Sequence, residues 1–303
     1  MLDYDVIIIG AGSAGLSAAI YTARARLNTL VVEQLMPGGQ IAVASEVENY
    51  PGFPDGILGP ELAQLLEAQA TKFGAQIESD QIQSIYKTGE THVVQGDTSQ
   101  YSARSLIIAS GGEHTLLGVP GESELSGRGV SYCATCDGNF FSGEDTLVVG
   151  GGDAAIDEGL YLSRIASKVT VIHRRDKLRA SKILQERAFN TPNMDFKWNH
   201  VVREIHGNGS VSGVLLENTE SGKIYEYPGS AVFIYIGFHP STGYLRNQVS
   251  MDPAGHIITN VRMETNVSGI FACGDVRQFS DKQLATAAGD GVTAAMSAYR
   301  FLS

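Results

Sequence analysis

One feature of the sequence constrains its fold more than any other, a strand–loop–helix–strand pattern that occurs twice. The first copy runs from the β-branched stretch at residues 6–9 through a glycine-rich loop at 10–15 to an apolar stretch that ends at Glu33. The second copy has its glycine-rich loop at 150–155 and ends its second apolar stretch at His173. A GxGxxG or GxGxxA loop between a buried strand and a helix is typical of dinucleotide-binding domains. The repeat therefore predicts an α/β protein with two Rossmann-like domains.

The two copies differ at the residue that ends the second strand, although 23 positions separate it from the first loop glycine in both. In the first copy Glu33 can accept hydrogen bonds from ribose hydroxyls, which fits FAD. In the second copy His173 replaces the acid, and Arg174, Arg175 and Arg179 follow it. Guanidinium groups suit a ribose 2′-phosphate, so this copy favours NADPH. A solvated basic loop is the alternative for these arginines.

A cysteine pair, Cys133 and Cys136, lies between the two copies and is followed directly by Asp137. Two cysteines at this spacing can take up and release two electrons as a disulfide and a dithiol, with the carboxyl as a neighbouring proton carrier. Half of a zinc site is the alternative. Zinc usually has four ligands, but Cys273 is the only other cysteine and the nearest histidines lack the ligand spacing. The number of available zinc ligands is too small, so redox chemistry is favoured and no metal site is expected.

Several polar residues outside the two glycine-rich loops are candidates for contacts with a flavin. Gln40 and Asn49 stand in loops rich in glycine and proline, and their amides can serve a ring with both donors and acceptors. Ordinary polar turn residues are the alternative. Asp275 follows a short apolar stretch, and a helix is expected at 283–301, with its positive N-terminal end available to the flavin. Cys273 is interpreted as a packed small residue.

Composition limits the possible functions. A length of 303 residues with 43% hydrophobic residues is enough for two domains. The net charge of −11 argues against a nucleic-acid partner. The acidic start of the chain is unlike a signal peptide, and no apolar run of about 18 residues predicts a membrane span. With three cysteines, a reducing cytoplasm is expected.

The rest of the chain completes the two predicted domains. Helices are expected at 16–26, 60–73 and 156–163, and short strands at 76–104 and 196–230. A further buried strand is expected at 105–112, and the chain is expected to cross between domains near 113 and again near 240. The predicted domains are 1–112, 113–240 and 241–303, the first and last being two segments of one domain.

The chain resembles low-molecular-weight thioredoxin reductases along nearly its whole length. The most specific strings are CATCDG at 133–138 and HRRDKLR at 173–179. The other motifs that carry the resemblance are residues 10–15, Gly39-Gln40, 47–54, 150–155 and 274–291.

The resemblance implies an FAD domain in two segments, an inserted NADPH domain, a homodimer and thioredoxin or a thioredoxin-like protein as the partner. It implies that Cys136 faces the flavin, Cys133 attacks the partner disulfide and Asp137 handles the proton. The flavin-binding residues expected are Gly10, Gly12, Ser13, Ala14, Gly15, Glu33, Gln34, Gly39, Gln40, Asn49, Gly274, Asp275, Gln283, Leu284 and Ala285. Those expected for the nicotinamide nucleotide are Gly150, Gly152, Asp153, Ala154, His173, Arg174, Arg175, Arg179, Ile236 and Gly237.

Some alternatives stay open at this point. Asn139 stands where many members of the family carry an aromatic residue, which affects the expected contact with the partner. A peroxiredoxin-reducing flavoprotein would usually carry an additional N-terminal part. A flavin-dependent dithiol oxidase or a ferredoxin-driven relative would share the cysteines but should lack the arginines at 174, 175 and 179. A nucleotide sensor without turnover would not need the cysteine pair.

Overall fold

The computed structural model describes residues 2–43, 47–246 and 248–303, and the chain divides into two compact units. One unit combines Met1–Glu113 with His239–Ser303, and the other is His114–Phe238. Two short strands, β7 (Gly112–His114) and β16 (Phe238–Pro240), pair with each other where the chain passes from one unit to the other. The second unit is therefore an insertion into the sequence of the first.

The first unit is built on a seven-stranded sheet with the order β3-β2-β1-β6-β5-β4, in which β17 also pairs with β6. The contacts β3-β2, β2-β1, β1-β6 and β6-β17 are parallel, whereas β4, β5 and β6 form an antiparallel meander. The strands are β1 (Leu2–Ile9), β2 (Thr29–Glu33), β3 (Gln76–Ser79), β4 (Ile82–Thr88), β5 (Thr91–Gly96), β6 (Gln100–Ile108) and β17 (Ile270–Ala272).

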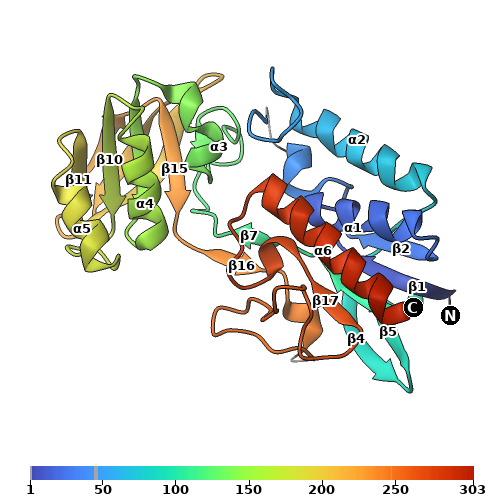
Figure 1. Cartoon of the computed structure of the whole chain (residues 1–303). Helices are drawn as coiled ribbons and strands as arrows, with labels where there is room; N and C mark the ends of the chain where they lie inside the picture. The colour runs from blue at the N-terminus through green and yellow to red at the C-terminus, as the bar shows by residue number, and fades with distance from the viewer. Residues whose placement is uncertain (1, 44–46, 247) are drawn as a thin grey trace. The chain divides into compact units, whose positions relative to one another are not determined.

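Three helices cover one face of this sheet, as Figure 1 shows for α1 (Ser13–Arg24), α2 (Gly59–Lys72) and α6 (Leu284–Leu302). Alternate strand residues explain the layering, since Val6 and Ile8 pack with the helices while Ile7 and Ile9 lie in the core on the opposite face. Short 3₁₀ turns lie at η1 (Gly39–Val43), η3 (Gly243–Leu245) and η4 (Gly274–Val276).

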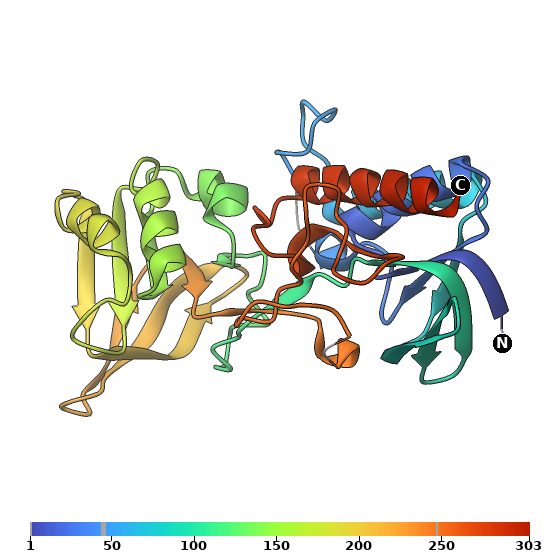
Figure 2. The same ribbon diagram turned by 60° about the horizontal axis from the view of Figure 1, so that its bottom comes forward.

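The second unit repeats this layered plan on a five-stranded parallel sheet with the order β11-β10-β9-β15-β8. Its core on one face includes residues of α4 and α5, and its core on the other face includes residues of the antiparallel sheet β12-β13-β14 (Figure 2). The elements are β8 (Val130–Ser131), α3 (Ala134–Asp137), η2 (Gly138–Phe141), β9 (Asp145–Gly150), α4 (Asp153–Leu162), β10 (Lys168–His173), α5 (Lys182–Phe189), β11 (Met194–Trp198), β12 (His200–Gly207), β13 (Val211–Asn218), β14 (Ile224–Pro228) and β15 (Ala231–Tyr235).

The prediction of two Rossmann-like α/β domains is confirmed, but some elements differ from expectation. The helix α1 begins at Ser13 rather than at residue 16, because the last loop residues already have helical geometry. The strand β6 begins at Gln100, and the helices α3 and α5 have no counterpart in the prediction. Among the described residues, no helix is both long enough and apolar enough to cross a membrane.

Candidate active site

The first glycine-rich loop has a geometry that only glycine permits at two positions. Gly10 has a φ of +104°, and a Cβ atom there would lie 2.4 Å from the carbonyl oxygen of Ala109. A Cβ atom on Gly15 would lie 1.8 Å from the oxygen of Gly10, so α1 packs directly on the loop. The helix begins at Ser13 and directs its free amides toward the loop, which is the arrangement that binds a pyrophosphate.

Glu33 closes this loop from the end of β2. One carboxylate oxygen accepts a hydrogen bond from the amide of Ala11 at 2.7 Å, and the other accepts one from the amide of Leu35 at 3.1 Å. Each oxygen still has a second lone pair, so the carboxylate can also accept hydrogen bonds from ribose hydroxyls.

Several segments distant in sequence meet at the first loop. A Cβ atom on Gly39 would lie 3.3 Å from the Cα atom of Gly12, and one on Gly274 would lie 2.9 Å from the Cβ atom of Ala14. The hydroxyl of Ser13 donates to the carbonyl of Leu284 at 2.9 Å. The N-termini of α1 and α6 therefore lie together, next to the close contacts at Gly39 and Gly274. We call this arrangement the dinucleotide cradle, because two helix N-termini can stabilise the charge of a pyrophosphate.

The amide side chains predicted for the flavin also belong to this unit. The side chain of Gln40 donates to the carbonyl of Gly112 at 3.4 Å, and that of Asn49 donates to Gln283 at 3.3 Å. Gln34 directly follows Glu33, and Ala285 lies in the first turn of α6. All the residues predicted for the flavin thus lie in the first unit, although no hydrogen bond ties Gln34 or Ala285 to the loop in the part of the chain that the structure describes.

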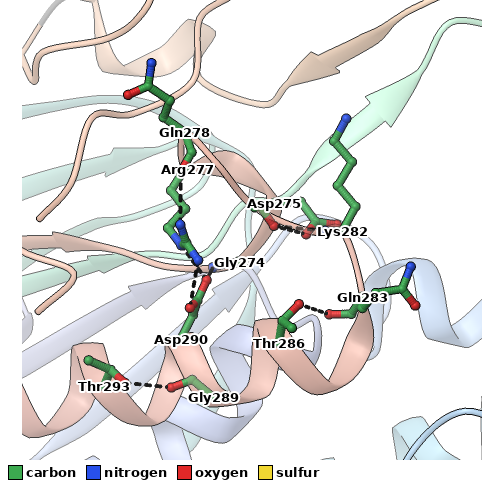
Figure 3. A network of polar contacts seen from close by, with 11 residues as sticks. Gly274, Asp275, Arg277, Gln278, Lys282, Gln283, Thr286, Gly289, Asp290 and Thr293 are labelled. Atoms are coloured by element: carbon green, nitrogen blue, oxygen red, sulfur yellow. Dashed lines mark hydrogen bonds and ion pairs between the residues drawn. The ribbon is translucent and has the colours of Figure 1, made fainter. Parts of the chain in front are cut away.

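A polar network next to Gly274 was not predicted from the sequence (Figure 3). Arg277 donates two hydrogen bonds to Asp290, with N–O distances of 2.5 and 3.0 Å, and Asp290 also accepts from the amide of Gly274 at 3.2 Å. Both side chains of the ion pair are largely buried. The pair fixes the turn η4 to the helix α6. A charged residue amid the small residues of an otherwise buried helix face is the signal that could have found Asp290.

Asp275 lies in the same turn, and its carboxylate accepts a hydrogen bond from the hydroxyl of Ser280 at 2.8 Å (Figure 3). Burial raises the pKa of Asp275, while the bond from Ser280 acts in the opposite direction. Burial lowers the pKa of the neighbouring Lys282.

The imidazole ring of His173 packs against the second glycine-rich loop at Gly151. A Cβ atom on Gly151 would lie 2.3 Å from the imidazole ring, and the ring bonds to the carbonyl of Lys177 at 3.0 Å. His173 is only 6% exposed, and burial lowers its pKa. The position that holds the acid in the first unit thus holds a neutral ring that packs under the loop.

The predicted arginines lie around this loop. Arg174, Arg175 and Arg179 are exposed, and in the described residues none of them forms an ion pair. The backbone amide of Arg179 donates to the carbonyl of Gly151 at 2.7 Å. The carboxylate of Asp153 accepts from the amide of Ser181 at 2.6 Å. The loop is therefore bound to the segment that carries the guanidinium groups.

The end of β15 borders the same loop. A Cβ atom on Gly150 would lie 2.5 Å from the carbonyl of Tyr235, which precedes the predicted contact residues Ile236 and Gly237. The carbonyl of Gly237 accepts a hydrogen bond from the amide of Thr115 at 3.0 Å. The predicted nicotinamide-nucleotide residues, including Gly152 and Ala154, thus belong to one side of the second unit, at the carboxyl ends of its parallel strands.

The cysteine pair forms a disulfide that spans the start of the short helix α3. Both cysteines are partly exposed, whereas Cys273 is a buried free cysteine. Within the described residues, no group of three or more histidine, cysteine or acidic side chains has an arrangement that could hold a metal ion.

Asp137 lies at the end of α3, in the environment of a proton carrier. Its carboxylate accepts a hydrogen bond from the hydroxyl of Ser131 at 2.6 Å, and that hydroxyl also accepts from the amide of Cys133 at 3.1 Å. Burial raises the pKa of Asp137, which brings its titration closer to neutral pH. A carboxyl group held beside a disulfide in this way can exchange protons with the thiols as they form.

Sequence reasoning also missed Tyr235 and Glu158, which lie beside the cysteine pair. The amide of Ala134 donates to the hydroxyl of Tyr235 at 2.6 Å, and this hydroxyl donates to Glu158 at 3.5 Å. A tyrosine at the end of an otherwise apolar strand was the available signal, but its partners come from other elements.

Comparison with known proteins agrees with this geometry. The family model described as pyridine nucleotide-disulphide oxidoreductase matches residues 4–291. A thioredoxin reductase from Bacillus subtilis is 53% identical over 99% of this chain and 95% of its own, and one from Listeria monocytogenes is 51% identical over 99% and 94%. The crystal structure of a thioredoxin reductase from Streptococcus pyogenes has a TM-score of 0.95 at 47% identity, covering 99% of this chain and 98% of its own.

Proposed function

The chain belongs to the pyridine nucleotide-disulphide oxidoreductase family, and from that premise we propose that it is a thioredoxin reductase that passes electrons from NADPH through FAD and the Cys133–Cys136 pair to thioredoxin. The observation that carries the proposal is the disulfide on α3, beside a half-buried carboxyl group with a raised pKa and in the same unit as a glycine-rich nucleotide loop. The relatives that match nearly the whole chain are named thioredoxin reductases.

The residues of the first unit fit FAD. Gly10, Gly39 and Gly274 let protein segments pack closely around the first loop, whereas a Cβ atom on Gly12 would meet nothing within 4 Å, and Glu33 can bind a ribose. Amide groups of Gln40 and Asn49 offer both donors and acceptors to a ring. When bound, the flavin would accept a hydride and deliver the two electrons to a disulfide.

The residues of the second unit fit NADPH. Arg174, Arg175 and Arg179 present exposed guanidinium groups next to the loop that carries Gly150 and Gly152. These groups can bind a 2′-phosphate through charged hydrogen bonds. The buried ring of His173 contributes by supporting the loop rather than by reaching the phosphate.

The cysteines carry the exchange with the partner. The Cys133 thiolate attacks the partner disulfide and forms a mixed disulfide, and one partner sulfur leaves as a thiolate and takes up a proton. The Cys136 thiolate then attacks Cys133, which restores the Cys133–Cys136 disulfide and releases the second partner thiol. Asp137 accepts or returns the protons that these steps move. The pair is oxidised and the partner is reduced by two electrons.

The proposal extends to the setting of the enzyme. It includes a homodimer, as the family resemblance implies, and a reducing cytoplasm, where a CxxC pair is more often catalytic than structural. The domain limits proposed from the sequence, 1–112 and 241–303 for FAD and 113–240 for NADPH, belong to the same proposal.

A coupled assay tests the proposal. Purified full-length protein with its flavin is mixed with NADPH, a thioredoxin and a disulfide reporter such as dithiobis(nitrobenzoate). Thioredoxin should accelerate reporter reduction strongly, and Cys133→Ser should abolish that acceleration while leaving reduction of the flavin by NADPH. No acceleration with any of several thioredoxins would refute the assigned partner. Oxidation of a dithiol by oxygen without any need for NADPH would instead indicate a dithiol oxidase.

A further inference from the structure

The start of the helix α3 differs from the usual environment of a redox cysteine. The helix begins directly after Cys133, so the amides of its first turn have no partner within the helix. Amides in this position commonly stabilise the thiolate of the preceding cysteine and lower its pKa. Here the amide of Ala134 instead donates to the hydroxyl of Tyr235 at 2.6 Å.

Glu158 of α4 also lies at the start of α3, next to the Tyr235 hydroxyl. The Tyr235 hydroxyl donates to the Glu158 carboxylate at 3.5 Å. The amides of Ala134 and Thr135 lie close enough to this carboxylate to favour its charged form. The two side chains therefore place an acceptor with a negative charge against the amides that would otherwise face a cysteine thiolate.

We propose that Glu158, positioned by Tyr235, opposes ionisation of the Cys133 thiol and thereby makes the Cys133–Cys136 pair a stronger reductant. A negative charge close to a thiol raises the thiol pKa. Reduction of the pair adds two electrons and two protons to the disulfide and gives two thiols. When the thiolate is less stabilised, the dithiol is less favoured and gives up its electrons more readily. The inference rests on the proposed role of the pair as an electron donor.

The other charges around α3 define the necessary controls. Asp137 lies on α3 itself, and Asp157 precedes Glu158 on α4 but is exposed. Among the described residues, Asp157 forms no hydrogen bond with α3. Farther away, Arg164, Glu186 and Arg187 line an open groove of about 780 Å³ together with Thr135, Asp157 and Glu158. Burial raises the pKa of Glu158, while the nearby amides of Ala134 and Thr135 act in the opposite direction and favour the charged form.

The test measures the pH dependence of Cys133 alkylation in the full-length, flavin-loaded protein. Cys136→Ser leaves Cys133 as the only accessible cysteine, because Cys273 is fully buried. In this background, Glu158→Gln should lower the midpoint of the iodoacetamide rate profile by about one pH unit. Asp157→Asn makes the same change of charge one residue away and should leave the midpoint within about 0.3 units. Tyr235→Phe keeps the charge and should give a smaller decrease than Glu158→Gln.

A second measurement leaves both cysteines in place. At a pH above the thiol pKa values, Glu158→Gln should shift the equilibrium of the pair with glutathione toward the dithiol by up to about tenfold, which corresponds to about 30 mV. An unchanged or raised alkylation midpoint in Glu158→Gln would overturn the inference, and so would equal shifts in Glu158→Gln and Asp157→Asn. Neither measurement uses NADPH or thioredoxin, so failure of the coupled assay together with the expected shifts would count against the proposed function alone.

Discussion

At the scale of single residues, Asp137 connects stability, pH and catalysis. Burial raises its pKa above 3.8, the value for an unperturbed carboxyl, so the folded protein binds this proton more tightly than the unfolded chain. The resulting stabilisation is complete below the unfolded pKa and is lost as the pH rises through the folded pKa.

The variant Asp137→Asn should therefore raise the melting temperature relative to the unsubstituted protein at pH 8, and this difference should shrink as the pH falls toward 4. The same variant should slow thioredoxin reduction by about 100-fold, since it removes the proton carrier. Calorimetry and rapid-mixing kinetics measure the two effects. An unchanged rate would exclude Asp137 from proton transfer. A pH-independent difference in melting temperature would contradict its raised pKa.

Ser131 provides a matched control for that prediction. Its hydroxyl donates to the Asp137 carboxylate and favours the charged form. Ser131→Ala should therefore raise the pKa of Asp137 further and move the acidic limb of the rate profile to higher pH. A shift toward lower pH would mean that another group controls this limb.

The exposed arginines of the second unit permit a test of nucleotide choice. A hydrogen bond to a charged group contributes about 1.5–3 kcal/mol, so Arg174→Ala or Arg175→Ala should weaken NADPH binding about tenfold or more. Binding of NADH should change little, because it lacks the 2′-phosphate. Arg187→Ala removes another exposed arginine of this unit and serves as the control. Equal loss for both nucleotides would show that the arginines support the structure only.

Site residues could be proposed from the sequence where the chemistry is local in sequence. The glycines at 10 and 150 stand in a fixed motif, and the cysteine pair with Asp137 forms a continuous string. By contrast, Tyr235 and Glu158 come from β15 and α4, and their meeting at α3 depends on the packing of three elements. His173 was predicted beside the arginines, but its ring is buried under Gly151 because that glycine leaves the space.

At the scale of secondary structure, the contact between η4 and α6 organises the side of the first unit where the N-termini of α1 and α6 lie together. Arg277 and Asp290 form a largely buried ion pair, and removing one partner of such a pair costs about 3–5 kcal/mol. Arg277→Met should therefore lower the free energy of unfolding and release flavin more easily, because the Gly274 turn loses its tie to α6.

A double variant separates charge from packing at this pair. Arg277→Met with Asp290→Leu replaces both partners and should recover much of the lost stability, since no unpaired charge stays buried. Denaturant unfolding and flavin retention after gel filtration measure the two effects. A single variant as stable as the unsubstituted protein would show that the ion pair does not hold the turn.

The same scale shows why some elements were predictable from the sequence and others were not. The strands β2 and β9 are short apolar runs that belong to the two copies of the repeated strand–loop–helix–strand pattern. The helix α5 has a mixed sequence in which only Ala188 is buried, so it lacks the apolar periodicity that reveals a helix. The helix α3 spans only Ala134–Asp137, too few residues to show any period.

At the scale of the whole molecule, the internal repeat predicted the fold class and the resemblance predicted the family. Two dinucleotide units on parallel sheets are present, and the pyridine nucleotide-disulphide oxidoreductase model matches most of the chain. The proposed cofactors and partner are recognised by particular side chains, so their identity cannot be deduced from the order of strands and helices alone.

The most direct test of the proposed electron path is an anaerobic titration with NADPH in the absence of thioredoxin, followed by flavin absorbance and thiol counting. If electrons pass through both the flavin and the Cys133–Cys136 pair, full reduction should consume two equivalents of NADPH per subunit and expose two new thiols. The double variant Cys133→Ser with Cys136→Ser should consume one equivalent. If the unsubstituted protein also consumes only one equivalent and forms no new thiols, the disulfide does not receive electrons from the nicotinamide nucleotide and the proposed path is wrong.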